Sequence, residues 1–199
     1  MDAYRAVLPQ PPRMSRTRRL LIVLAAALLG CQVRPRVSTM SADDVAHEVS
    51  VERSPSKHLT TYSGMMLGSD SIAGGVAMQY NLRSFLQEGQ HHPTHQLFVA
   101  RKYEASRFWN YARARDAAGS SLTTTVLRRD FDNCVQVLGQ CTYAENLAID
   151  LPDDLMRASA TNGLQVRVAG ETGRGEFEVD VPAPYVQGQM KALAADAGS

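Results

Sequence analysis

Short segments of alternating apolar and polar residues, separated by turn residues, fill the chain from residue 58 onward and constrain its fold more than any other feature. A period of two places successive side chains on opposite faces of a β-strand, so that one face can be buried. In residues 142–151, for example, Leu147, Ile149 and Leu151 share one face. The predicted strands cover residues 58–63, 76–82, 96–103, 107–115, 122–129, 135–137, 142–151, 164–169 and 176–181, with a short helix or turn at 153–160.

These strands predict a mainly β protein, because no alternation of helix and strand of the kind that builds a parallel sheet occurs between them. A short C-terminal helix is expected from Pro184, with Val186, Met190 and Leu193 on one face. We therefore expect a single β-sandwich domain, immunoglobulin-like or C2-like, over residues 58–196.

The N-terminus carries a different pattern, in which basic residues precede a short apolar run. Arg13, Arg16, Arg18 and Arg19 stand directly before the apolar and small residues 20–30. This order is the layout of a secretory signal peptide. A permanent transmembrane helix needs about 20 apolar residues, so the run is too short to span a membrane. A buried core helix is the alternative interpretation.

The end of the apolar run, Leu28-Leu29-Gly30-Cys31, resembles the lipobox of bacterial lipoproteins. Leu28 matches the favoured leucine, Gly30 the small residue and Cys31 the invariant cysteine, while Leu29 departs mildly from the pattern. The resemblance covers residues 14–31. It implies that a signal peptidase cuts before Cys31 and that the sulfur of this cysteine carries a diacylglyceryl group. No motif in the rest of the chain identifies a family.

Lipidation implies a membrane location, because two or three acyl chains, at about 0.8 kcal/mol per buried CH₂, give stable anchoring. In Gram-negative lipoproteins an aspartate after the cysteine favours the inner membrane. Gln32 stands there instead, so the resemblance implies the outer membrane, on its periplasmic or surface face. The polar residues 31–57, which include Pro35 and Pro55, are expected to form a flexible tether. A short helix around residues 42–49 is the alternative for part of this stretch.

Charge separates the signal peptide, residues 1–30, from the rest of the chain. The whole chain has a net charge of +1, but its first 30 residues hold five arginines and one acid, which leaves −3 for the remainder. A mildly acidic domain gives no reason to expect a nucleic-acid partner. The sequence also contains no Gly-x-Ser-x-Gly elbow, EF-hand loop, P-loop or dinucleotide fingerprint. These absences favour a non-enzymatic function.

With Cys31 assigned to lipid, Cys134 and Cys141 form the remaining pair of cysteines. An exported chain meets an oxidising compartment, and a tight hairpin containing Gly139 can bring two Cα atoms within the ~4.4–6.8 Å that a disulfide needs. We therefore predict a Cys134–Cys141 disulfide. A redox or metal-binding pair is the alternative, although the spacing is not Cys-x-x-Cys.

Three histidines lie close together in the segment His91-His92-Pro93-Thr94-His95. Neutral imidazoles bind zinc, copper or nickel, so His91, His92 and His95 are candidate metal ligands. Pro93 disfavours the helix that would align them, and the interpretation that we favour is a solvated loop with freely titrating histidines. No other cofactor is expected.

A second candidate site lies in the predicted strand 107–115. Its members are Trp109, Tyr111, Arg113 and Arg115, which would share one face of the strand. They could stack on a glycan ring or a partner peptide, since Trp, Tyr and Arg are enriched at binding hot spots. Half-buried packing, with the arginine stems over the aromatic rings, is the interpretation that we favour.

These features together predict a membrane-anchored lipoprotein of the bacterial cell envelope. Its domain is expected to be a non-enzymatic binding or structural and assembly module, with an envelope protein or a surface polymer as partner. The alternative is a metal-binding protein or envelope enzyme that uses the three histidines.

Overall fold

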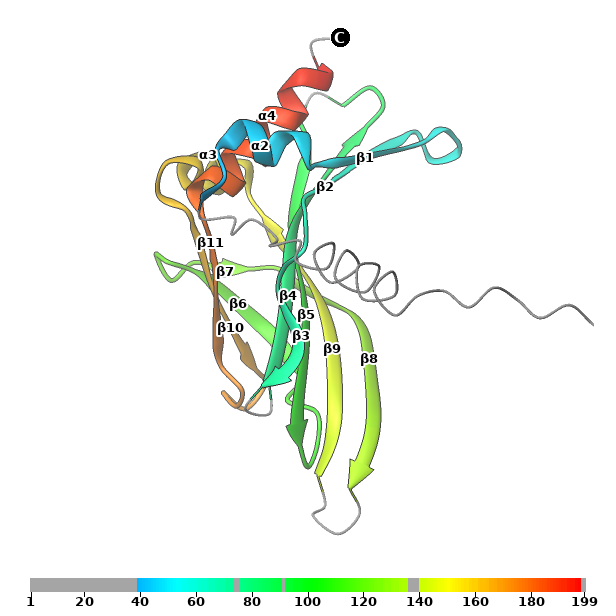
Figure 1. Cartoon of the computed structure of the whole chain (residues 1–199), viewed down its shortest axis with the longest axis vertical. Coiled ribbons are helices and arrows are strands. Elements are labelled where there is room, and N and C mark those ends of the chain that lie inside the picture. Colours follow the sequence, from blue (N-terminus) through cyan, green and yellow to red (C-terminus); the bar gives the residue numbers. More distant parts are fainter. Residues whose placement is uncertain (1–38, 74–75, 91, 136–139, 198–199) are drawn as a thin grey trace, which may run out of the picture. The chain divides into compact units, whose positions relative to one another are not determined.

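The computed structural model describes residues 39–73, 76–90, 92–135 and 140–197, which belong to the compact unit Arg36–Ser199. Two antiparallel sheets face each other in this unit, and its helices gather at one end, as Figure 1 shows. The predicted β-sandwich with a short C-terminal helix is therefore confirmed. Because the unit has its own hydrophobic core, it is expected to fold without the residues that precede it.

The larger sheet has seven strands in the order β1-β2-β4-β5-β9-β8, and β3 pairs with β4 beyond the end of β2. The inward residues of β5, which include Leu97 and Val99, are buried, while the residues between them are partly or fully exposed. The alternation in the sequence is thus the alternation between core and surface. The strands are β1 (Ser50–Ser54), β2 (Leu59–Ser63), β3 (Leu67–Ala73), β4 (Val76–Gln87), β5 (Thr94–Ala105), β8 (Thr124–Val135) and β9 (Gln140–Leu151).

The smaller sheet has four strands in the order β11-β10-β6-β7. Thr123 alone separates β7 from β8, so the chain passes directly from one sheet to the other, and the Thr123 carbonyl accepts from the Asp150 N–H at 2.9 Å. On the opposite side, the Tyr80 hydroxyl on β4 donates to the Asp180 carbonyl on β11 at 2.8 Å. The strands are β6 (Tyr111–Asp116), β7 (Ser121–Leu122), β10 (Leu164–Gly170) and β11 (Phe177–Val181).

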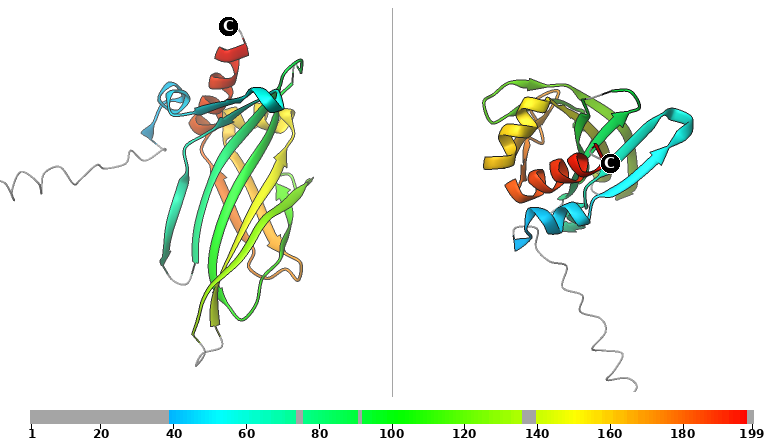
Figure 2. Two further views of the ribbon diagram at one scale, coloured as in Figure 1. Left: turned by 90° about the vertical axis from the view of Figure 1, so that its right-hand side faces the viewer. Right: turned by 90° about the horizontal axis from the view of Figure 1, so that it is seen from above.

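The α-helices of the described residues gather at one end of the sandwich, as the right-hand view of Figure 2 shows. They are α2 (Ala42–His47), α3 (Asp153–Asn162) and α4 (Ala183–Ala197). Gly188 costs α4 about 1 kcal/mol relative to alanine, but it lets α2 approach closely. A Cβ at position 188 would lie 2.5 Å from the Cβ of Val45, which is 1% exposed. Among the described residues, no helix is long and apolar enough to span a membrane.

Part of the stretch that the sequence assigns to a flexible tether is folded. The short-helix alternative is confirmed, because α2 occupies this stretch and begins directly after Ser41. The Ser41 hydroxyl accepts a hydrogen bond from the Asp44 N–H at 3.2 Å, and the Asp44 carboxylate accepts one from the Ser41 N–H at 3.0 Å. β1 follows and pairs with β2 along its whole length. The folded unit therefore starts well before residue 58, and the signal peptide and Cys31 lie outside the described residues.

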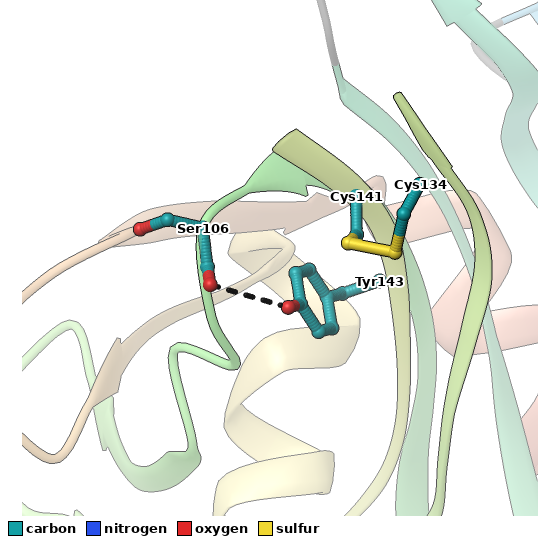
Figure 3. Close-up of a disulfide and its surroundings, with 4 residues drawn as sticks. All are labelled: Ser106, Cys134, Cys141 and Tyr143. Carbon is teal, nitrogen blue, oxygen red and sulfur yellow. Dashed lines mark hydrogen bonds between the residues drawn. A yellow bond between two sulfur atoms is a disulfide. The ribbon is translucent and has the colours of Figure 1, made fainter. Parts of the chain in front are cut away.

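The predicted disulfide is present and joins β8 to β9 (Figure 3). The Cys134 and Cys141 sulfur atoms are 2.03 Å apart, and the two Cα atoms are 4.0 Å apart, which is closer than the expected ~4.4–6.8 Å. Two residues along β9, the Tyr143 hydroxyl donates to the Ser106 carbonyl at 3.3 Å. Figure 1 shows that this hairpin reaches beyond the smaller sheet at the end opposite the helices. The disulfide thus fastens two strands in the part of the larger sheet that the smaller sheet does not cover.

Candidate functional site

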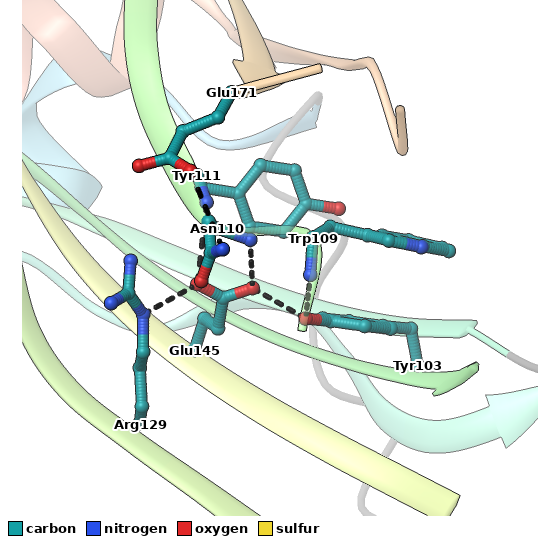
Figure 4. Close-up of polar contacts among 7 residues, drawn as sticks. All are labelled: Tyr103, Trp109, Asn110, Tyr111, Arg129, Glu145 and Glu171. Atoms are coloured by element: carbon teal, nitrogen blue, oxygen red, sulfur yellow. Dashed lines mark hydrogen bonds and ion pairs between the residues drawn. The ribbon is translucent and has the colours of Figure 1, made fainter. Parts of the chain in front are cut away.

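Glu145 on β9 is a fully buried carboxylate beside the start of β6. It accepts hydrogen bonds from the backbone N–H groups of Asn110 and Tyr111, each at 3.2 Å, and from the Tyr103 hydroxyl. Arg129 Nε on β8 donates to the same carboxylate at 3.1 Å (Figure 4). A buried carboxylate is tolerated only where donors and an opposite charge replace water. These four donors supply both.

Aromatic rings pack beside this carboxylate and fix the loop between β5 and β6. Trp109 stacks on Tyr103 with ring centroids 4.0 Å apart, and its backbone N–H donates to the Tyr103 hydroxyl at 2.9 Å (Figure 4). Tyr111 meets the two rings edge-on, at 6.0 and 6.1 Å. Burial and the hydrogen bond to Glu145 raise the pKa of Tyr103 above its usual range. Its hydroxyl therefore keeps its proton and remains a donor to Glu145.

Arg101 adds a buried cation to the same region. Arg101 is only 8% exposed. Its guanidinium lies 4.0 Å from the centroid of the Phe177 ring and 5.9 Å from the centroid of the Tyr111 ring. Its Nε has no hydrogen-bond partner among the described residues. Burial lowers the pKa of Arg101, yet arginine stays protonated in proteins. The cation–π contacts thus replace part of its lost hydration.

A second polar group is buried near the helical end. Ser84 Oγ on β4 lies 2.9 Å from His95 Nδ1 on β5 and accepts from Gln189 Nε2 on α4 at 3.1 Å. His95 Nε2 has no hydrogen-bond partner among the described residues and lies 3.5 Å from Asp153 Oδ1. Hydroxyl, imidazole and carboxylate follow one another as in an acid–base relay. However, Ser84 is 0% exposed, so a substrate has no access to its hydroxyl.

A cavity of about 510 Å³ lies beside this group, with His95 and Asp153 in its wall. Thr123 and Asp150 line it as well. Burial lowers the pKa of His95, more strongly than Asp153 raises it, so the imidazole favours its neutral form. A ligand in this cavity would meet the carboxylates of Asp150 and Asp153, whereas His95 is only 2% exposed and its Nε2 is buried.

The structure separates two of the three histidines predicted as metal ligands. β5 begins at Thr94, and its alternation turns His95 into the core, whereas His92 is exposed and His91 lies outside the described residues. Within the described ranges, no group of three or more His, Cys, Asp or Glu side chains could hold a metal ion. Metal binding by His91, His92 and His95 therefore stays a prediction.

The aromatic and basic residues expected on one strand face are divided between core and surface. Tyr111 is buried and Trp109 half-buried, while Arg113 and Arg115 are exposed. Tyr111 pairs with Gly170, and Arg113 pairs with the residue before Gly170, so β6 contains one extra residue between them. Such a bulge reverses the alternation of side chains. The packing interpretation therefore describes the two aromatic residues, and the two arginines face away from them.

Three of the most buried polar residues were missed by the sequence analysis, namely Ser84, Glu145 and Gln189. A signal for Glu145 was available, because it lies on the same face of its strand as Leu147 and Ile149, where an acid requires donors. Ser84 and Gln189 carried no such signal, since a hydroxyl or an amide in an amphipathic segment is equally compatible with the surface.

No protein-family model, curated protein or solved structure matches this chain. The candidate functions are accordingly limited to those that its own residues support.

We expect Glu145→Gln to lower the free energy of unfolding by about 2–4 kcal/mol. The amide leaves Arg129 without its counter-charge. It also replaces one carboxylate oxygen, which accepts hydrogen bonds, with an NH₂ group that can only donate them. Urea unfolding followed by circular dichroism measures this loss. Glu104→Gln, an exposed position on β5, is the matched control and should stay within about 0.5 kcal/mol of the wild type. A Glu145→Gln protein as stable as the control would contradict a structural role for the carboxylate.

The lowered pKa of His95 predicts that stability decreases as the pH falls below about 6.5. The unfolded chain binds the proton near the usual pKa of 6.5, whereas the folded protein resists it, so the stabilising contribution is complete above pH 6.5 and is lost towards the folded-state pKa. The urea midpoint should drop between about pH 7.5 and about pH 5.5, and drop less in His95→Gln. His92→Gln, at an exposed position, should retain the wild-type slope. Identical slopes in the wild type and His95→Gln would count against the buried imidazole as the cause.

Proposed function

We propose that this chain is a lipoprotein of a bacterial cell envelope, anchored through Cys31. The order of basic residues, apolar run and lipobox-like Leu28–Cys31 supports the proposal. Seven residues separate Cys31 from Thr39, the first residue described. Fully extended, seven residues reach about 25 Å, so the folded unit is held close to the lipid. Gln32 favours the outer membrane as its destination.

The anchored unit acts as a non-enzymatic binding or assembly module, with an envelope protein or a surface polymer as the partner class. The observation that carries this proposal is the complete internal use of Glu145, whose carboxylate is bonded to four donors. Because this carboxylate is fully buried, a substrate cannot come within hydrogen-bond reach of it. Ser84 is equally unsuited to nucleophilic attack, because its hydroxyl is enclosed.

A second candidate function is histidine-dependent metal binding, or an envelope enzyme that uses it. One observation favours it. Among the described residues, the buried Nε2 of His95 has no hydrogen-bond partner, and it lies 3.5 Å from Asp153 Oδ1 in the wall of a cavity. Ser84 would hold the other ring nitrogen, as the outer partners of metal-bound histidines commonly do.

The anchor is tested by Cys31→Ser, which should abolish incorporation of an alkyne-tagged fatty acid and release the protein from the membrane fraction, because a serine hydroxyl does not form the thioether. Cells expressing the full chain are labelled, fractionated and probed for the tag. The double variant Cys134→Ser/Cys141→Ser is the matched control, since it loses two sulfurs and should keep the label. Label that persists in Cys31→Ser would refute the lipobox assignment.

The two candidate functions are separated by metal titration of the purified unit Arg36–Ser199. After treatment with a chelator, zinc or copper chloride is added in a calorimeter. The module proposal expects no stoichiometric binding that depends on His95. Stoichiometric binding that disappears in His95→Gln and survives in His47→Gln, at an exposed histidine outside the cluster, would replace the module by the metal-binding function.

A further inference from the structure

β8 is a free edge of the larger sheet, and it carries exposed apolar side chains. It pairs with β9 on one side only, and its outer side presents backbone N–H and C=O groups to solvent. Leu127 is 51% exposed and Phe131 is 70% exposed, and these are the two most exposed large apolar residues of the described chain. A long edge strand with apolar side chains is a template for the addition of another strand.

Two irregularities limit where such an addition can take place. The register of β8 against β9 shifts between Val126 and Arg128 and again between Asp132 and Cys134. Bulges twist an edge and interrupt its ladder. Between the two shifts, Arg128–Asp132 pair residue by residue with β9, so these five residues form the regular part of the edge.

The charges in this window are complementary to themselves. Arg129 and Phe131 lie opposite Glu145 and Tyr143 on the inner face, so Arg128 and Asp130 lie on the outer face, where the two form an ion pair within the strand. Strands that run antiparallel about a two-fold axis at position 129 place each Arg128 opposite Asp130 of the other strand. Opposite charges at directly facing positions stabilise a strand pair.

With the axis at position 129, Arg128–Asp130 are the residues of the window that face one another directly, and Phe131 lies beside them. Arg129 would face Arg129 of the second copy, but each of these side chains is already paired with its own Glu145 at 3.1 Å. Phe131 would lie diagonally beside Arg129 of the second copy, within the reach of aromatic and long side chains. The arginine stem and guanidinium would then cover a ring that is largely exposed in the single chain.

We propose that β8 pairs antiparallel with β8 of a second copy of this chain, about a two-fold axis at Arg129, so that the two larger sheets become one continuous sheet. Self-complementary charge selects a second copy as the occupant of this edge, and a two-fold axis uses the same surface on both partners. The pairing goes beyond the proposed function and does not need the lipid, because every residue in it belongs to the unit Arg36–Ser199.

The test is the oligomeric state of the unit Arg36–Ser199, after circular dichroism has established that each protein is folded. Sedimentation velocity is measured between about 5 and 500 μM, because an interface with about three directly facing residues per strand is small and is expected to dissociate in the micromolar range or above. The wild type should form a dimer. Arg128→Asp and Asp130→Arg should each dissociate at least tenfold more readily, because like charges then face each other twice.

An equimolar mixture of Arg128→Asp with Asp130→Arg should form a heterodimer, since every facing pair in it is again opposite in charge. This rescue excludes a folding defect as the cause of dissociation. Arg115→Asp, the same change at an exposed position on β6, is the control and should dimerise like the wild type. A wild type that stays monomeric over the whole range, single variants that still dimerise, or a mixture that fails to pair would each overturn the proposal.

A lipid surface could also cover the exposed apolar residues of β8, and vesicle co-sedimentation distinguishes it from a second copy of the chain. The same proteins are mixed with vesicles of phosphatidylethanolamine and phosphatidylglycerol and sedimented. The proposal expects no binding that depends on Phe131. If a monomeric wild type sediments with the vesicles and Phe131→Ser does not, the patch belongs to the membrane and the pairing of β8 is wrong. Because the unit lacks Cys31, neither result depends on the lipid anchor.

Discussion

Glu145 places a carboxylate inside a β-sandwich, where an unpaired charge would cost several kcal/mol. Its four donors come from β5, from the loop before β6, from the first residue of β6 and from β8. They belong to both sheets, so satisfying this one group fixes where the chain leaves the larger sheet and enters the smaller one. The stacked rings of Tyr103 and Trp109 occupy the space that this connection encloses. Without the carboxylate, two backbone N–H groups and the Arg129 guanidinium would lose their common acceptor.

At the helical end of the sandwich, several buried polar atoms lack hydrogen-bond partners among the described residues. Asn81 Oδ1, Gln189 Oε1 and His95 Nε2 are buried without a hydrogen-bond partner within the described ranges. Each belongs to a side chain whose other polar atom is bonded, to the Gly64 carbonyl, the Tyr62 carbonyl or Ser84. An unpaired buried polar atom is rare in a native protein, and a bound ion, a water molecule or a catalytic role is among its explanations. Three of the four such atoms among the described residues therefore lie where α3 and α4 meet β4 and β5, and the fourth is Arg101 Nε.

The alternation of apolar residues was sufficient to predict the β-sandwich and most of its strands, because most strands bury one face against the other sheet. The strand β1, which has no buried residue, was not predicted. It was insufficient wherever a local irregularity breaks the period, as the extra residue in β6 between Tyr111 and Arg113 shows. The helix α2 lies in a stretch for which we favoured a flexible tether, because its sequence carries little apolar signal. Val45 is its only buried residue, and its stability comes from the Ser41–Asp44 cap and from contact with Gly188. Nothing in the local sequence reports that second contact.

The candidate sites also divide into those that local sequence determines and those that depend on contacts between distant parts of the chain. The Cys134–Cys141 pair could be predicted because its geometry is determined by a short hairpin, whereas His95 depends on residues far away in the chain. Ser84, Gln189 and Asp153 surround it from three different elements. A run of histidines in the sequence reports proximity along the chain, but the direction of each imidazole is set by where β5 begins.

The seven-residue separation of Cys134 and Cys141 has a consequence for the order of folding. On its other side β9 pairs with β5, and the partners there are far apart in sequence, as for Leu97 and Ile149. Closing a short loop costs little conformational entropy, and a hairpin forms within microseconds, before such distant partners meet. Oxidation of the two thiols therefore requires the β8–β9 hairpin alone. In an oxidising compartment the edge hairpin becomes covalently fixed while the rest of the sandwich is still assembling, and it then offers β5 a preformed strand on which to pair.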